Sequence, residues 1–305
     1  MWDISSDIIT ALSTAAHNGA NITVIMPWSE RSSDTSGAAT LTAAGARVKW
    51  EYTTASAPAT ATSTTGYESA PMDIHAKFAL VDGVAYMDGH NWFTTDVVMQ
   101  DGIAGDFAAI QADLENFPAA PPGNSTFTTD KQLSLKNESA YLQSVIPTLT
   151  SSANEYDFIT ESFNPNPSGG EYNDDVYDGM CQIAALPAHV TMHVVVEDFS
   201  TDSNAAQSAL QNLMLLDPNA SVRSTSSGQE KISMVRSAVG GMPTSAWFGS
   251  SNSTTTDLFD WGMNITNSTM LSALQSYFDP VFNSASAIPS APAGTAAAPC
   301  SSVHP

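Results

Sequence analysis

Four side chains suited to phosphate chemistry stand at short spacings in the first half of the chain. His75 and Lys77 are separated by one residue, Asp82 follows after four more, and Asn91 ends the turn DGHN at 88–91. A phosphodiester resists attack because its charge repels nucleophiles, so its cleavage needs a neutral nucleophile and donors for the nonbridging oxygens. A neutral imidazole can attack phosphorus to give a phosphohistidine, while ammonium and amide groups hold those oxygens. Side chains of these types can therefore cleave a phosphodiester without a metal ion.

An incomplete copy of this pattern lies in the second half of the chain. Gln229 and Lys231 are again separated by one residue, Arg236 follows after four more, and the turn GSSN at 249–252 contains Ser250 and Asn252. The copy has kept the groups that can hold phosphate and has lost the histidine and the aspartate. We therefore expect one complete and one incomplete half-motif.

The spacing HxK(x)4D, followed by a turn that ends in Asn, resembles the signature of the phospholipase D-like superfamily, with Asp88 in place of the first Gly of the turn. The resemblance makes His75 the nucleophile and gives Asp82, at a hairpin, a supporting role. It implies that no metal or cofactor takes part. The phosphate ligands would be Lys77, Asn91, Lys231 and Asn252, with Ser250 and Gln229 beside them.

The lost histidine leaves the source of the proton open. In the family the second histidine protonates the leaving alcohol and then activates water, and removing such a group typically costs ~10² to 10⁴-fold in rate. Gln229 can donate a hydrogen bond but cannot carry a proton. Either the substrate has an acidic leaving group, or another group supplies the proton, or the chain is a binding protein that has kept its phosphate ligands. His90 is the nearest candidate acid, and a hydrogen-bonding role in the turn is the alternative.

The remaining candidates are one acid and three histidines. Glu161, in ITESF at the end of a predicted strand, resembles the family's strand leading into the cleft and is a candidate to orient His75; the alternative is a solvated acid. His189 and His193 lie on or beside a predicted core strand, so we expect structural roles for them. His17 ends a predicted helix, where a cation favours the helix dipole.

Helices and strands alternate around the first half-motif. Apolar periodicity predicts helices at 3–17, 37–44 and 103–117, and a long loop at 53–70. Strands are expected at 22–26, 47–52, 77–81, 84–87 and 96–100. Asp82-Gly83 is a strong two-residue hairpin signal, so Lys77 begins the first strand of a hairpin.

The same order of elements recurs after a linker that contains Pro and Gly. Strands are expected at 156–163, 190–196, 221–224, 229–236 and 258–263, and helices at 174–185, 205–215 and around 271–278. The strand at 156–163 has no counterpart in the first half. We therefore expect the chain to be an N-terminally truncated form of a longer product.

The composition bears on partners and compartment. The chain has 305 residues, with 9 Lys and Arg against 31 Asp and Glu, for a net charge of -22, and this charge disfavours nucleic acid as a partner. No apolar run reaches the roughly 18 residues of a membrane helix, and residues 1–10 lack the order of a signal peptide. Scarce lysine with abundant Ser, Thr and Ala favours a secreted or otherwise exported protein.

The two cysteines, Cys181 and Cys300, are too far apart in sequence for a CxxC redox or zinc motif. In an exported protein they could bind the C-terminal tail to the second lobe; two free thiols are the alternative.

Together these patterns predict an α/β fold of two pseudo-symmetric phospholipase D-like lobes, each a mixed sheet flanked by helices. The expected divisions are a first lobe at 1–118, a linker at 119–134, a second lobe at 135–283 and an irregular tail at 284–305. The resemblance implies hydrolysis or headgroup transfer on a phosphodiester, with a phospholipid favoured as substrate. A pseudoenzyme that binds a phosphate-containing ligand is the alternative, and a nuclease is less favoured. Because one chain holds both half-sites, we expect a monomer.

Overall fold

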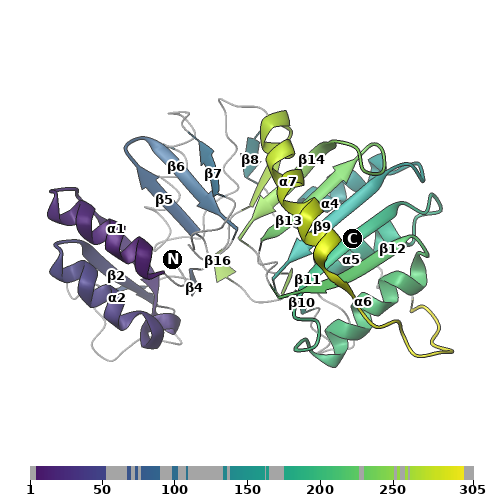
Figure 1. The fold of residues 1–305 in the computed structure, drawn as a ribbon, viewed down its shortest axis with the longest axis horizontal. Coiled ribbons are helices and arrows are strands. Elements are labelled where there is room, and N and C mark those ends of the chain that lie inside the picture. Colours follow the sequence, from purple (N-terminus) through teal and green to yellow (C-terminus); the bar gives the residue numbers. More distant parts are fainter. Residues whose placement is uncertain are drawn as a thin grey trace. The chain divides into compact units, whose positions relative to one another are not determined.

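The computed structural model describes residues 5–52, 67–69, 73–74, 77–89, 98–101, 108, 133–135, 138–161, 163–164, 175–226, 230–250, 253–254, 258–259 and 262–298. The chain forms two compact units, which Figure 1 shows as ribbons. Unit 1 comprises Met1–Lys131 and Asp257–Trp261. Unit 2 comprises Gln132–Thr256 and Gly262–Pro305.

Unit 1 opens with two helices on a small parallel sheet. The elements are α1 (Ser6–His17), β1 (Thr23–Pro27), the 3₁₀ helix η1 (Trp28–Glu30), α2 (Arg31–Ala43), β2 (Arg47–Tyr52) and β3 (Tyr67–Ser69). The three strands pair in the order β1-β2-β3, and Val24, Met26 and Leu41 form the centre of the core between sheet and helices. A Cβ atom at Gly37 would lie 2.6 Å from Ile9 Cδ1, so a larger residue there would displace the end of the Ile9 side chain between α1 and α2.

The rest of unit 1 contains the hairpin of the first half-motif. β5 (Lys77–Val81), β6 (Val84–Asp88) and β7 (Val98–Asp101) form an antiparallel sheet. Asp82 and Gly83 connect β5 to β6 with φ angles of 49° and 87°, the positive values that a two-residue hairpin turn of type I′ requires. The predicted hairpin is confirmed.

One strand of unit 1 comes from the second half of the sequence. β16 (Leu258–Phe259) pairs in parallel with β4 (Asp73–Ile74), with Leu258 opposite Asp73. β4 ends directly before His75, and β16 follows Asn252 by six residues. This small sheet therefore joins chain segments that adjoin both half-motifs.

Unit 2 is built on an eight-stranded mixed sheet in the order β18-β12-β11-β9-β13-β14-β17-β8. The neighbours β9, β11 and β12 are parallel, and the remaining pairs in this sheet are antiparallel. Two further short strands, β10 (Phe163–Asn164) and β15 (Ser253–Thr254), pair with each other. The strands of the large sheet are β8 (Leu133–Leu135), β9 (Glu155–Thr160), β11 (Thr191–Glu197), β12 (Ala220–Thr225), β13 (Lys231–Arg236), β14 (Pro243–Gly249), β17 (Gly262–Ile265) and β18 (Ser286–Ala287).

Helices cover this sheet on both faces (Figure 1). On one face, strand side chains such as Phe158, Val194 and Trp247 form a single hydrophobic core with Met180 of α5 and Leu210 of α6. α7 packs on the opposite face, against β14, β11 and β12. The helical elements of unit 2 are α4 (Glu138–Val145), η3 (Ile146–Thr148), α5 (Asp175–Ala184), α6 (Asn204–Leu216) and α7 (Ser268–Ser284). The predicted α/β fold, with a mixed sheet flanked by helices, is confirmed.

Several predicted boundaries were wrong. The expected strand at 258–263 is two strands, β16 and β17, which belong to different sheets and different units. A short apolar run does not reveal where a strand is interrupted, because periodicity needs a longer window. β3 lies inside the segment predicted as a loop at 53–70, and α2 begins at Arg31 rather than at residue 37. The helix 103–117 falls outside the described residues except for residue 108.

The C-terminal tail packs on α6. Asn212 Nδ2 donates to the carbonyl oxygen of Ala298 at 3.2 Å, and the Ala298 N–H donates to Asn212 Oδ1 at 2.7 Å. Cys181 on α5 is disulfide-bonded, and the chain's other cysteine, Cys300, lies just beyond the described tail. Of the alternatives that the sequence left open, the free thiol is therefore wrong for Cys181.

Among the described helices, none has the length and apolar character needed to cross a membrane.

Candidate functional site: two equivalent lysines at strand starts

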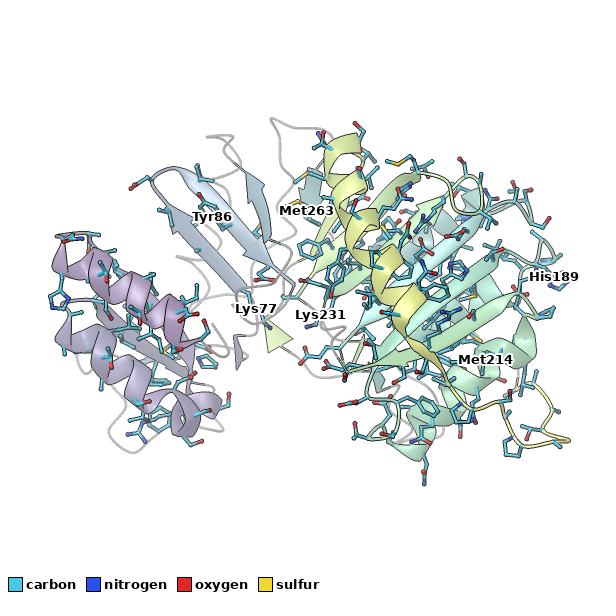
Figure 2. The ribbon with its side chains drawn as sticks, in the orientation of Figure 1. Lys77, Tyr86, His189, Met214, Lys231 and Met263 are labelled. Atoms are coloured by element: carbon cyan, nitrogen blue, oxygen red, sulfur yellow. The ribbon has the colours of Figure 1, made fainter. Side chains whose placement is uncertain are left out.

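Lys77 is the first residue of β5, and its side chain is almost fully buried, with 1% exposed (Figure 2). Across the hairpin it stands opposite Asp88, the first residue of the turn at 88–91, which is also buried. Burying an ammonium is costly unless charged or polar groups surround it, so a lysine at this depth indicates a built polar site. His75, His90 and Asn91 lie outside the described residues.

Lys231 is the first residue of β13, and it is also 1% exposed (Figure 2). It stands opposite Gly249, the first residue of the turn at 249–252, and the following residue, Ser250, is fully buried. Gln229 and Asn252 lie beyond the part of unit 2 that is described. Of the candidate phosphate ligands of the second half-motif, Lys231 and Ser250 are therefore among the described residues.

The two lysines hold equivalent positions. Lys77 pairs with Asp88 across β5 and β6, and Lys231 pairs with Gly249 across β13 and β14. In each case the lysine begins the strand and its partner is the first residue of the four-residue turn that ends in Asn. The repeat inferred from residue types is thus present in the backbone register of both hairpins.

Glu161 approaches the second lysine. The residue directly follows β9, and its Oε2 lies 2.6 Å from Lys231 Nζ, with 32% of the glutamate side chain exposed. Its predicted part in orienting His75 stays a prediction, because His75 is outside the described residues. The observed contact assigns the carboxylate to the lysine of the second half-motif.

Asp82 and Arg236 occupy the same place in the two half-motifs but in different surroundings. Asp82 is exposed at the tip of the hairpin, about 17 Å along the strand from Lys77 at ~3.4 Å per residue. Arg236 ends β13 and is 1% exposed. Neither lies beside its lysine, so both are at the other end of the strand from it.

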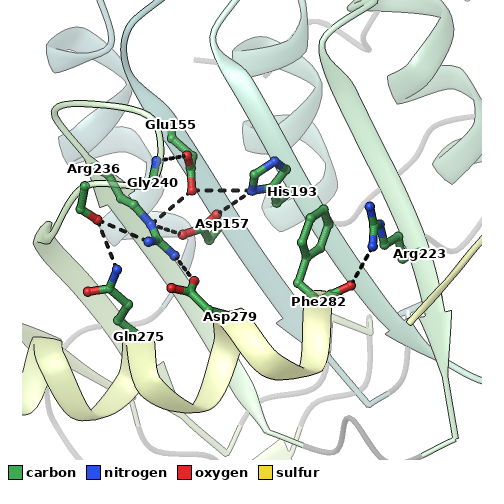
Figure 3. A network of polar contacts seen from close by, with 10 residues as sticks. Glu155, Asp157, His193, Arg223, Arg236, Gly240, Gln275, Asp279 and Phe282 are labelled. Atoms are coloured by element: carbon green, nitrogen blue, oxygen red, sulfur yellow. Dashed lines mark hydrogen bonds and ion pairs between the residues drawn. The ribbon is translucent and has the colours of Figure 1, made fainter. Parts of the chain in front are cut away.

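Arg236 is the centre of a buried charge network beneath α7 (Figure 3). Its Nε lies 2.5 Å from Asp157 Oδ2 and 3.0 Å from Glu155 Oε1, and its Nη2 lies 2.6 Å from Asp279 Oδ1 on α7. Glu155 and Asp157 are two residues apart on β9, so both side chains project to the same face of the sheet, the one that α7 covers. Arg236, which stands where the first half-motif has Asp82, is thus matched by three carboxylates.

His193 joins the same network from β11. Its Nδ1 lies 3.3 Å from Asp157 and 3.4 Å from Glu155, and its ring stacks on Phe282 of α7 at 4.1 Å. Burial alone would lower the pKa of His193, but the hydrogen bonds to Asp157 and Glu155 outweigh it and raise the pKa to about 9. The prediction of a structural role for His193 is confirmed.

The two carboxylates respond differently to the same partners. Burial raises the pKa of Asp157 to about 6, against the opposing effects of His193 and Arg236. Burial also acts to raise the pKa of Glu155, but hydrogen bonds from His193 and from the Gly240 N–H hold it at about 2. Glu155 therefore stays ionised down to a lower pH than Asp157 does.

Glu155, Asp157 and His193 place one donor atom each within 4.8 Å of one another, close enough to hold a metal ion. The Arg236 guanidinium, however, already contacts both carboxylates at 3.0 Å and 2.5 Å. A fixed cation at this distance repels a second one, so we interpret the cluster as a structural ion network. Its sequence signal was two acids, Glu155 and Asp157, on a strand otherwise expected to be core.

The two other histidines among the described residues, His17 and His189, are at the surface. His189 has 56% of its side chain exposed and a left-handed backbone, with φ of 49°, and it lies two residues before β11, beside the core strand as predicted. His17 ends α1, and its Nδ1 lies 2.9 Å from the carbonyl oxygen of Ser13, as expected for a residue at the end of a helix.

No protein-family model and no curated protein sequence matches the chain. Solved structures, in contrast, match the chain in fold. Polyphosphate kinase from Porphyromonas gingivalis aligns over 98% of this chain with a TM-score of 0.56 and 12% identity, and this chain spans 48% of its length. Phosphatidylserine synthase from Haemophilus influenzae Rd KW20 aligns over 93% of this chain and 86% of its own, with a TM-score of 0.59 and 9% identity.

At such low identity the likeness concerns the fold alone. Both proteins have folds of the phospholipase D superfamily. Their alignments extend over both units of this chain, and the two hairpins repeat the same lysine register within it. The chain therefore has the fold of the phospholipase D superfamily.

Proposed function

We propose that the chain is a phosphodiesterase that works through a phosphohistidine at His75. The observation that carries the proposal is the matching register of Lys77 opposite Asp88 and Lys231 opposite Gly249. A buried lysine is costly to keep in a fold unless charged or polar groups surround it, and both lysines are buried at equivalent strand starts, as two phosphate-holding ammonium groups would be.

In the first step of the proposed reaction, the His75 imidazole attacks phosphorus and the leaving alcohol departs. Lys77 and Asn91 would donate to the nonbridging oxygens, and Lys231 and Asn252, with Ser250 beside them, are the corresponding phosphate ligands of the second half-motif. Charge builds on these oxygens in the transition state, and preorganised donors in a buried site stabilise such charge strongly. Because Gln229 cannot give a proton to the alkoxide, substrates with acidic leaving groups should react fastest.

Charge guides the choice among phosphodiesters. The net charge of -22 works against a polyanionic substrate, because association with nucleic acid draws its free energy from cationic contacts that release counterions. A phospholipid or another small diester is therefore favoured over a nuclease substrate. The disulfide at Cys181 supports export, since such bonds persist in oxidising compartments.

One observation favours a second candidate, a non-catalytic protein that binds a phosphate-containing ligand. Lys231 is paired with Glu161 at 2.6 Å, so an incoming phosphate must compete with a carboxylate for this ammonium. Together with the loss of the second histidine, this pairing is compatible with a site kept for binding.

Trapping separates the two candidates. The protein is incubated with a bis(nitrophenyl) phosphodiester and with a phospholipid, quenched, and examined by mass spectrometry for acid-labile phosphate on histidine. The phosphodiesterase should be labelled at His75, and His75→Ala should abolish the label while His17→Ala, a change at an exposed helix end, should keep it. Saturable binding of a diester without any label, and equal binding by His75→Ala, would establish the binding protein instead.

A further inference from the structure

We propose that Glu161 sets the ligand charge that the second half-motif accepts. By cancelling the charge of Lys231, it favours a singly charged phosphodiester, whereas the lysine alone would prefer a doubly charged phosphate monoester. The inference rests on the proposed role of Lys231 as a phosphate ligand. It assigns a specificity-determining residue that the motif pattern does not contain, since Glu161 directly follows β9, far in sequence from Gln229–Asn252.

Two neighbouring strands of unit 2 hold the carboxylate beside the ammonium. β9 and β13 are antiparallel, with Ile159 opposite Ile232, so the residue that follows β9 lies beside the start of β13. Both strands are buried along their whole length, and Glu161 Oε2 lies 2.6 Å from Lys231 Nζ. A carboxylate is therefore part of the surroundings in which Lys231 would hold a phosphate.

The two side chains differ in their exposure to solvent. The lysine side chain is 1% exposed and the glutamate side chain is 32% exposed, so solvent reaches the carboxylate and not the ammonium. A phosphate that accepts a hydrogen bond from Lys231 Nζ must therefore share the ammonium with Glu161 or displace the carboxylate towards solvent. In both cases the glutamate charge stays close to the charge of the ligand.

This pairing changes how the site responds to ligand charge. A lone ammonium attracts a doubly charged ligand more strongly than a singly charged one, because the Coulomb energy grows with the product of the charges. The pair of Lys231 and Glu161 has no net charge, so the repulsion from the carboxylate opposes the attraction of the ammonium for a second negative charge. The preference for a dianion that Lys231 alone would have is thus removed.

Such selectivity suits both candidate functions. A phosphodiester carries one negative charge, whereas a phosphate monoester carries close to two at neutral pH, because its second pKa is about 6. In a phosphodiesterase the monoester is the product of hydrolysis, and a site without net charge does not retain it. In a binding protein the same site would take up a diester without being filled by free phosphate.

The test compares two ligands that share a phenyl group and differ in charge, the monoester phenyl phosphate and the diester methyl phenyl phosphate. Their dissociation constants are measured by titration calorimetry at pH 8, in a His75→Ala background that prevents turnover. Glu161→Gln removes the charge and keeps the size of the side chain, so it should tighten binding of the monoester roughly tenfold more than binding of the diester. Glu197→Gln, the same change at the end of the neighbouring strand β11, should leave both affinities unchanged.

Two further variants in the same background separate charge from structure. Glu161→Asp keeps the charge, so it should keep the ratio of the two dissociation constants measured with Glu161 in place. Lys231→Met tests the premise, because loss of the ammonium should weaken binding of both ligands.

The outcomes distinguish this inference from the proposed function. An equal effect of Glu161→Gln on both ligands, or no effect on either, would overturn the role of Glu161 and leave Lys231 as a phosphate ligand. If Lys231→Met binds both ligands as tightly as its parent, or if the parent binds neither, then Lys231 is not a phosphate ligand. The proposed function of the second half-motif would then be wrong, and this inference with it.

Discussion

Arg236 of β13 and Asp157 of β9 form a buried ion pair, with 2.5 Å between Nε and Oδ2 and exposures of 1% and 0% (Figure 3). The pair connects two central strands, and Asp279 extends it to α7. At the position where the first half-motif has Asp82, the second has an arginine whose partners are all structural. Arg236 therefore connects β9, β13 and α7 on this face of the sheet.

Removing this arginine should destabilise unit 2. Arg236→Ala leaves Glu155 and Asp157 buried without their main cation, and breaking a buried ion pair in this way costs roughly 3–5 kcal/mol in the free energy of unfolding. Urea denaturation followed by tryptophan fluorescence measures the loss. Arg31→Ala, at an exposed arginine that contacts Trp28, should change stability by no more than about 0.5 kcal/mol.

An aspartate at position 236, as in the first half-motif, should lower the free energy of unfolding of unit 2. Arg236→Asp places a fourth carboxylate among Glu155, Asp157 and Asp279, so it should be less stable than Arg236→Ala. A variant as stable as the wild type, or more active, would contradict the structural role of Arg236.

The stability of unit 2 should fall as the pH rises above neutrality. The pKa of His193 is about 9 in the folded protein against an ordinary value of 6.5, so its stabilising charge is fully present below pH 6.5 and is lost as the pH rises through 9. The loss should be roughly 2–3 kcal/mol, measured as the free energy of unfolding in urea between pH 6 and 9.5. His193→Gln should flatten this slope, whereas His17→Gln should leave it intact.

Below pH 6 the two carboxylates of the network should oppose each other. Asp157, whose pKa is raised to about 6, favours the folded state as the pH falls, whereas Glu155, whose pKa is lowered to about 2, withdraws stability as the pH falls through its range. We therefore expect a shallow acid slope in the same measurements. A steep loss between pH 6 and 4 would show that Asp157 is charged in the folded protein.

The C-terminal tail should stabilise unit 2 through the disulfide of Cys181. Cys300→Ser should free Cys181 and lower the free energy of unfolding by roughly 2–4 kcal/mol, as expected for a bridge that closes a long loop. Mapping of peptides without reduction identifies the bridge. Asn212→Ala, which removes only the two hydrogen bonds to Ala298, should have the smaller effect. Two titratable thiols in the folded wild type would contradict the bridge.

A histidine at position 229 of the second half-motif should increase the rate of the first chemical step. Gln229→His supplies an acid for the leaving alcohol, so turnover on alkyl phosphodiesters should rise by ~10²-fold or more, while turnover on nitrophenyl diesters should change little. Steady-state rates on the two classes provide the comparison. An equal increase on both would mean that leaving-group protonation does not limit the reaction.

The first hairpin was readable from sequence because its signal is local, whereas β14, which pairs with β13 in the second half-motif, was not predicted. Asp82-Gly83 fixes a turn, and the spacing of each lysine from its turn fixes the strand that bears it, so the positions of Lys77 and Lys231 could be predicted. The parallel core strands were readable for the same reason, since short apolar runs such as 190–196 are typical of buried strands.

The contacts of Glu161 and Arg236 could not be predicted because they depend on strand order. β9 lies between β11 and β13, so residues far apart in sequence become neighbours on one sheet face. Periodicity places a side chain on a face but does not say which strand lies beside it. α4 was missed because its apolar residues Tyr141, Leu142 and Val145 stand among polar ones in too short a segment.

The pairing of β16 with β4 has a consequence for engineering the chain. A cut between residues 131 and 132 would not yield two self-sufficient fragments, because the fragment 1–131 would lack the strand that Leu258 and Phe259 contribute to its own fold. Co-expressed halves would have to exchange this strand to assemble, as in split-protein complementation. A gene fusion or circular permutation should therefore keep residues 257–261 continuous with both of their flanking segments.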